Sequence, residues 1–245
     1  MGRVGRDFVE HTKYPRLRRD DEERALPQPP LQAAWPAEAP VVELPEPVPT
    51  GARATSFLQL AEGRTSLRRY SREPLSQAEL AYLLYATQGV KAAESSHTLR
   101  TVPSAGARHA FETHVLANRV AGLSQGLYRY LALDRKLVQL GRDANLASAI
   151  TAACLGQQFV ATSAATFIWV AVVERMTWRY GQRGYRYLYL DAGHVCQNLY
   201  LAAEAIGCGV CAIAAFDDDA LNGILQLDGE TQFAIYVAAL GRRPQ

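Results

Sequence analysis

The sequence has few cysteines and almost no net charge for its 245 residues. Its four cysteines lie in apolar stretches of a long chain, which argues for a reducing compartment and against a disulfide framework. A net charge of +2 gives no strong electrostatic basis for binding nucleic acid or an anionic membrane surface. We therefore expect neither as a partner. The cysteines are Cys154, Cys196, Cys208 and Cys211.

Long apolar runs are missing as well. The best candidate for a membrane span, Phe159 to Val173, is too short, and three hydroxyl residues between 162 and 166 interrupt it. The segment from Gly2 to Arg24 is strongly charged and contains no secretory h-region. Together these features predict a cytoplasmic protein.

Several catalytic signatures are absent or stand in the wrong context. There is no G-x-S-x-G elbow and no P-loop, so hydrolase and NTPase functions lack support. Gly207 to Ala212 has the G-x-G-x-x-A spacing of a dinucleotide-binding motif. It follows a predicted helix and precedes extended chain, whereas that motif needs a strand and then a helix.

A zinc site is the remaining alternative in this region. His194, Cys196, Cys208 and Cys211 are spaced like a zinc set, but Cys196 takes the place of the proton-moving Glu of deaminases. We favour small buried cysteines and expect no metal. The run Asp217 to Asp219 could bind a cation, yet carboxylates favour helix N-termini and are better explained as a cap.

Proline is concentrated in one segment. Eight prolines lie between Pro27 and Pro49, which excludes a helix or central strand and favours an extended conformation. The segment is either a disordered tail or an arm wrapped over a partner subunit. Trp35 and the apolar residues 41–44 favour an ordered arm. We divide the chain into an extended N-terminal arm, residues 1–55, and a folded domain, residues 56–245.

The folded domain mixes helices and strands without a regular βαβ rhythm, which predicts an α+β fold. A capping box at Ser76 to Glu79 starts a helix that Gly89 can end. The fully apolar run Ala165 to Val173 is typical of a buried central strand. We expect further helices at 57–61 (its end, capped by Gly63), 146–160 and 187–206, and further strands at 111–117, 126–130, 137–140 and 231–240.

The segment Arg64-Thr65-Ser66-Leu67-Arg68 has the most informative pattern of the chain. In extended backbone, Arg64, Ser66 and Arg68 point to one face, while Leu67 turns to the core. Two guanidinium groups and a hydroxyl on one face suit a phosphate. The alternative is a set of solvated surface charges. The ending Gly241-Arg242-Arg243 could add a further arginine to the same anion.

Several ordered motifs resemble the FMN-dependent nitroreductase superfamily and its SagB-type dehydrogenase branch. Residues 64–70 resemble the R-x-S-x-R opening of the superfamily, and residues 100–107 resemble the R-x-x-P-S-A-G-A of the branch. Residues 83–90, with Tyr85 where a Trp is usual, and residues 185–199 also resemble that branch, and residues 212–217 are similar to the family's loop beside the flavin.

The resemblance implies a nitroreductase-like fold, a mixed or antiparallel sheet flanked by helices, in an intertwined homodimer with two FMN sites at the interface. In such a site, Arg64, Ser66 and Arg68 hold the phosphate and ribityl end. A fixed backbone donor near the flavin N5 stabilises charge on reduction. The other implied cofactor-binding residues are Thr65, Pro103, Ser104, Ala105 and Gly106 (from the other subunit), Ala214, Ala215 and Arg243.

Members of this branch oxidise azolines in ribosomal peptides to azoles and return the electrons to oxygen. The resemblance implies that members with this activity use a Lys-Tyr pair ahead of the long helix to remove the ring proton. Here Arg179-Tyr180 is the nearest match. An arginine is effectively always protonated and is a poor general base. The alternatives are an NAD(P)H-dependent nitroreductase or flavin reductase acting on small molecules, or a non-catalytic flavin-binding subunit of a peptide-modifying complex.

Overall fold

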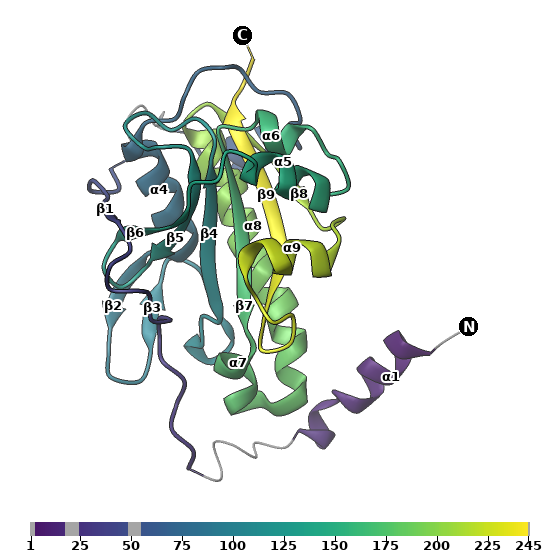
Figure 1. Ribbon diagram of the computed structural model, residues 1–245. Coiled ribbons are helices and arrows are strands. Elements are labelled where there is room, and N and C mark those ends of the chain that lie inside the picture. Colours follow the sequence, from purple (N-terminus) through teal and green to yellow (C-terminus); the bar gives the residue numbers. More distant parts are fainter. Residues whose placement is uncertain (1–2, 18–24, 49–54, 245) are drawn as a thin grey trace.

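The computed structural model describes residues 3–17, 25–48 and 55–244. Its centre is a seven-stranded sheet in the order β1-β6-β5-β4-β7-β9-β8, in which every ladder is antiparallel (Figure 1). The strands are β1 (Val41–Glu43), β4 (Phe111–Ala117), β5 (Gly126–Leu131), β6 (Lys136–Gly141), β7 (Ala165–Val172), β8 (Cys208–Ile213) and β9 (Gln232–Arg242). A separate hairpin joins β2 (Val90–Ala93) and β3 (Thr98–Arg100).

Helices cover both faces of the sheet. The helices of the described chain are α1 (Val4–His11), α3 (Phe57–Gly63), α4 (Gln77–Gln88), α5 (Leu146–Ala153), α6 (Phe159–Thr162), α7 (Val173–Tyr180), α8 (Gly184–Ala205) and α9 (Asp218–Leu225). Short 3-10 turns form η1 (Tyr14–Arg16), η2 (Ala105–Ala107) and η3 (Gly181–Arg183). α8 runs along one face, and α1 stands away from the body of the molecule (Figure 1).

The central strand β7 explains why two helical layers are needed. Phe167 and Trp169 point into a core shared with α4 and α8, while Ile168 and Val170 point into a second core shared with α5 and α9. All eight residues of β7 are buried. A strand that is apolar on both faces must be covered twice. The predicted α+β class and the buried central strand are confirmed.

The local signals mark most of the expected elements. Ser76 accepts a hydrogen bond from Glu79 N, the capping box is complete, and Gly89 caps the C-terminus of α4. Asp217 caps α9 through Ala220 N. The short helix α3 starts at its own capping box on Ser56, so the expectation that 57–61 is the end of a longer helix is wrong.

The continuous helix expected over residues 146–160 is also wrong. α5 ends at Ala153, and Leu155 and Gly156 then take positive φ values of 54° and 72°. The Gly156 N–H donates to Thr151 O at 2.9 Å, which satisfies a carbonyl at the helix end. A left-handed glycine is the common way to stop a helix, and this signal outweighs the apolar periodicity across it.

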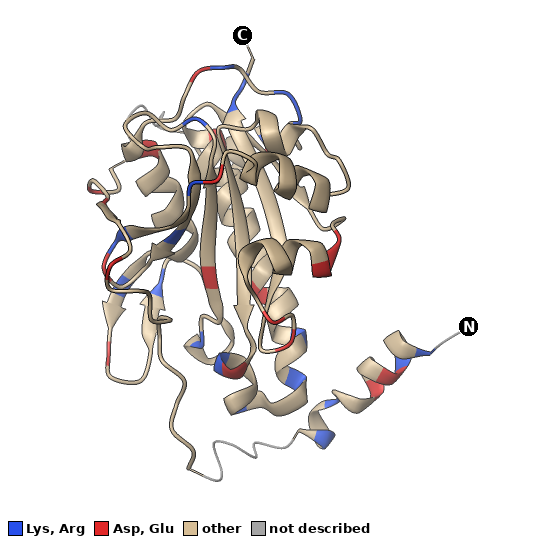
Figure 2. Ribbon diagram, viewed as in Figure 1, with Lys and Arg blue, Asp and Glu red and all other residues tan. Residues whose placement is uncertain are grey.

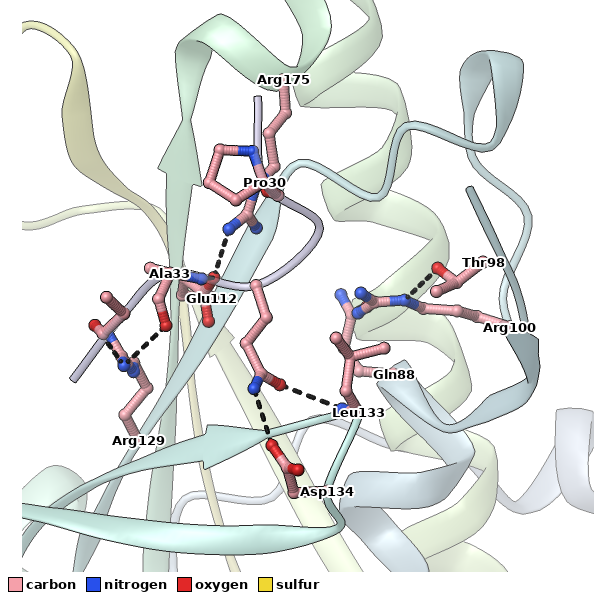
Figure 3. A network of polar contacts seen from close by, with 12 residues as sticks. Pro30, Ala33, Gln88, Thr98, Arg100, Glu112, Arg129, Leu133, Asp134 and Arg175 are labelled. Carbon is pink, nitrogen blue, oxygen red and sulfur yellow. Dashed lines mark hydrogen bonds and ion pairs between the residues drawn. The ribbon is translucent and has the colours of Figure 1, made fainter. Parts of the chain in front are cut away.

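The described part of the proline-rich arm, residues 25–48, lies along its own chain. Its strand β1 pairs with β6 at the edge of the sheet. Ala33 N donates to Glu112 Oε1 at 2.8 Å, and the buried Arg175 donates to the same oxygen at 2.6 Å and to Pro30 O at 2.8 Å (Figure 3). Arg129 donates to the carbonyls of residues 33 and 34. Residues 25–48 of the arm are therefore part of the fold of this chain.

No helix in residues 3–17, 25–48 and 55–244 is both long and apolar enough to cross a membrane.

Candidate functional site

The arginine segment lies across the edge of the sheet, on a pair of glycines. Gly209 of β8 and Gly241 of β9 are direct partners in the ladder. A Cβ at Gly209 would lie 2.5 Å from a Leu67 methyl carbon, and a Cβ at Gly241 would lie 2.9 Å from Tyr70. Leu67 N also donates to Val210 O at 2.8 Å. The absence of side chains here lets the segment seat flat on the sheet, with Leu67 inward as predicted.

Tyr200 of α8 holds the outward side of this segment. Its hydroxyl lies 3.1 Å from Ser66 Oγ and accepts a hydrogen bond from Ala212 N at 2.9 Å. The Arg64 guanidinium stands 5.3 Å from the centre of the Tyr200 ring. These contacts fix Arg64 and Ser66 on one side of α8. Tyr200 was not among the predicted site residues.

The other predicted phosphate ligands differ in their surroundings. Thr65 and Arg68 are exposed. Arg243 Nη2 lies 3.4 Å from Gly63 O, beside the start of the segment, and pairs with Glu204 of α8. Arg242 instead pairs with Glu79 at 2.6 Å. Of the two terminal arginines, Arg243 is thus the one beside the segment, although a carboxylate already balances its charge.

A cavity of about 420 Å³ opens where β8 ends. Ala214, Gly193 and Tyr189 line it together with Ala192, Phe216 and Tyr236. Ala214 and Ala215 are exposed, and neither of their N–H groups has a hydrogen-bond partner in the described part of the chain. Burial raises the pKa of Tyr189 and raises that of Tyr236 to about 12. The two hydroxyls remain protonated at neutral pH and can donate hydrogen bonds.

The turn Pro103 to Gly106 is held from another direction by Asp191 of α8. Ser104 Oγ donates to Asp191 Oδ2 at 2.6 Å and accepts from His109 N at 2.9 Å. Ala105 N approaches the same carboxylate at 3.3 Å. Burial raises the pKa of Asp191, and these two hydrogen bonds oppose the rise. Asp191 was not among the predicted site residues either. An acidic residue within a largely apolar helix is a sequence signal that could have indicated it.

Arg179 and Tyr180, at the end of α7, lie against this same turn. Gly106 has a φ of +57°, and a Cβ there would lie 2.5 Å from Tyr180 Oη and 3.3 Å from Arg179 Cδ. The Arg179 guanidinium is 5.8 Å from the centre of the Tyr180 ring, which meets Tyr187 edge-on at 4.8 Å. The structure therefore brings the predicted pair and the predicted turn together.

The predicted residues form two groups on opposite sides of α8. Tyr200 follows Asp191 by nine positions, which is about half a turn in angle at about 100° per residue. Asn198, on the Asp191 side, donates to Ala86 O of α4 at 2.9 Å. Tyr189 and Gly193 share the Tyr200 side, beside the cavity at Ala214. Within one chain, the arginine segment and the turn therefore contact opposite sides of α8.

Three of the four candidate zinc residues are cysteines of the core. Cys196, Cys208 and Cys211 are free and buried, and burial raises the pKa of Cys196 and Cys208 to about 12. His194 is exposed on α8. In the described ranges, no group of three or more His, Cys, Asp or Glu side chains is arranged to hold a metal ion.

Comparison with known proteins identifies the family. A model of the Nitroreductase family matches residues 61–242. "Putative nitroreductase MJ1384" of Methanocaldococcus jannaschii is 34% identical over 180 residues, 74% of this chain and 87% of that protein. The trifolitoxin-processing protein TfxB of Rhizobium leguminosarum bv. trifolii is 28% identical over 140 residues, 56% of this chain but only 38% of that protein.

A solved structure from Ralstonia eutropha, also described as a nitroreductase, matches with a TM-score of 0.67 and 26% identity. The match covers 90% of this chain and 100% of that one. Since the family model spans both the arginine segment and the turn, and the fold agrees along nearly the whole chain, the protein belongs to the Nitroreductase family of oxidoreductases.

Proposed function

We propose that the chain is an FMN-dependent oxidoreductase of the SagB-type dehydrogenase branch, acting on azolines in a peptide as a homodimer with two sites. The observation that carries this proposal is the division of the site residues between opposite sides of α8. Asp191 holds the turn on one side and Tyr200 holds Arg64 and Ser66 on the other. A second subunit is the way to bring one copy of each group to a single flavin.

The residues present fit FMN. Arg64, Ser66 and Arg68 would hold the phosphate, because guanidinium groups and a hydroxyl match its oxygens. The exposed N–H groups of Ala214 and Ala215, beside the cavity, would donate to the ring system. Bound there, FMN would supply hydride transfer, and a fixed backbone donor would stabilise the charge that develops. The turn of the partner subunit would close the site against water.

The peptide substrate is supported by the relative named as a trifolitoxin-processing protein. The Tyr180 hydroxyl lies against the turn, and in this proposal it handles a proton of the substrate. The four buried free cysteines suit a protein that works in a reducing compartment.

A second candidate is an NAD(P)H-dependent reductase of small molecules. Arg179 takes the place of the lysine that the resemblance implies for active azoline oxidases. A permanently charged guanidinium cannot take up a proton. The Arg179 guanidinium lies over the Tyr180 ring, so its role here is to pack and to orient the tyrosine.

The decisive experiment is purification followed by absorption spectroscopy. We expect a yellow protein with an FMN spectrum, one FMN per chain and the mass of a dimer in analytical ultracentrifugation. Anaerobic mixing with an azoline-bearing peptide, and separately with NADPH, shows which one bleaches the flavin and so separates the two candidates. A colourless protein that added FMN cannot reconstitute contradicts both.

A further inference from the structure

A cavity of about 350 Å³ lies between the N-terminal segment and the junction of α7 and α8. Lys13 and Arg16 line it from the N-terminal side, and Gly181, Arg183 and Tyr185 line it from the junction. This volume lies within the range of pockets that bind small molecules. The arginine segment and the Ala214 cavity contribute none of its lining residues.

The lining is cationic. Lys13, Arg16 and Arg183 carry three positive charges, His11 adds an imidazole, and none of the lining residues within 3–17, 25–48 and 55–244 is acidic. Glu10 pairs with both Lys13 and Arg16, the latter at 2.6 Å, and balances one of these charges from outside the cavity. Basic residues lie on α7 and at the start of α8, while α1 carries both basic and acidic residues (Figure 2). The local excess of positive charge favours an anionic ligand.

Arg183 is held in place before any ligand arrives. Its Nε donates to the Tyr187 hydroxyl at 2.7 Å and its Nη1 to Thr12 O at 2.6 Å. Its guanidinium also lies 5.7 Å from the centre of the Tyr14 ring. Nη2 makes no hydrogen bond within the described residues. A guanidinium fixed by neighbours loses less entropy when it binds an anion.

The cavity adjoins the candidate catalytic pair. Gly181, one of its lining residues, directly follows Tyr180, whose hydroxyl lies against Gly106 of the turn. The cavity and the candidate catalytic pair thus meet at the end of α7.

We propose that this cavity binds a carboxylate or phosphate group of the substrate. The proposal rests on the proposed function, which it deepens by naming the charge of the group that is recognised. Two sources share this chemistry: an acidic side chain of a peptide and a phosphate of a nicotinamide dinucleotide. Whichever source binds also decides between the two candidate functions.

The test is a charge reversal in the full chain, Lys13→Glu with Arg16→Glu, after saturation with FMN. Lys91→Glu is the matched control, because Lys91 is exposed on β2 and lines none of the cavity. The swap Lys13→Arg with Arg16→Lys keeps the charge and is expected to keep the affinity. Calorimetry measures the Kd of two probes, NADP⁺ and tetraglutamate, while FMN content and Tm report the fold.

We expect the charge reversal to raise the Kd of one probe by about tenfold or more, since it replaces two attractive charges by repulsive ones. Weaker binding of NADP⁺ supports the phosphate of a nicotinamide dinucleotide as the source of the anion. Weaker binding of tetraglutamate supports an acidic side chain of a peptide. Equal affinities in the reversal and in Lys91→Glu, with FMN content and Tm unchanged, overturn the anion site alone. Failure of the wild-type chain to take up FMN is a different result, which contradicts the proposed function.

Discussion

The arginine segment and the Pro103–Gly106 turn are held in contrasting ways. The segment packs against the main chain of the Gly209–Gly241 pair. A contact between two neutral hydroxyls, those of Ser66 and Tyr200, also holds it. The turn is held by hydrogen bonds to one buried carboxylate, that of Asp191, and it requires a positive φ at Gly106. The difference teaches that a single long helix serves two sites at once, supplying Tyr200 to one side and Asp191 to the other.

The largest expected effect comes from separating the two halves genetically. Arg64→Ala with Arg68→Ala disables the segment, and Gly106→Val disables the turn by a clash with Tyr180. Each variant alone is expected to lose FMN. Mixed and refolded together in equal amounts, they are expected to regain about a quarter of the sites, because half of the dimers are mixed and each has one intact site. Flavin absorbance measures the recovery.

No recovery in the mixture, with mixed dimers demonstrated by tagged subunits, would mean that both halves serve the same chain. The two-sided arrangement on α8 would then have to be rejected as the basis of the site.

The next effect concerns the face of the arginine segment. Arg68→Ala is expected to weaken FMN binding by about 10- to 100-fold, the worth of one charge-assisted hydrogen bond. Arg69→Ala is the matched control, because successive residues of an extended chain point to opposite faces and both arginines are exposed. Equal losses in fluorescence titrations with FMN would show that net charge, and not the face, attracts the phosphate.

A smaller effect is expected at the turn. Asp191→Ala removes the acceptor of both Ser104 Oγ and Ala105 N, and a freed turn should weaken FMN several-fold. Asp191→Asn keeps one carbonyl acceptor and should restore part of the affinity. The flavin reduction potential is the second readout, since a change in overall stability alone would not shift it. Identical behaviour of the two variants would argue against a positioning role.

The smallest effect is a pH dependence confined to the turn. Burial raises the pKa of Asp191 in the folded chain above its ordinary value. At pH values between the ordinary and the raised pKa, the folded chain therefore binds more protons than the unfolded chain. The free energy of unfolding should therefore fall as the pH rises from the ordinary pKa to the raised one. Asp191→Asn should remove this fall. Urea unfolding at pH values from 3.5 to about 6 measures it, and an unchanged slope in the variant would place the titration elsewhere.

Much of the fold is legible in the sequence because the signals are local. The capping box at Ser76, the apolar run of β7 and the alternation of Arg64, Ser66 and Arg68 each act within a few residues. The helix break at Leu155 and Gly156 is also local, but a competing apolar periodicity concealed it. Arg243 was placed at the segment by the motif ending and lies beside Gly63 in the structure.

The partners of the site residues were beyond the reach of the sequence. Ser104 and Asp191 are 87 positions apart, and Ser66 and Tyr200 are 134 apart. Which residues meet at such separations depends on the rotational setting of α8 against its neighbours. Packing of the whole core decides that setting, because no local pattern fixes it.

The sequence by itself thus determined most of the element types, the shared face of the arginine segment and the small-residue turn, since backbone geometry and side-chain chemistry act at short range. Only the tertiary structure decided that the face and the turn stand on opposite sides of α8, that Arg179 and Tyr180 join the turn, and that a basic cavity opens beside them. Those arrangements follow from the packing of the whole core, in which β7 is buried on both faces and α8 covers one of them.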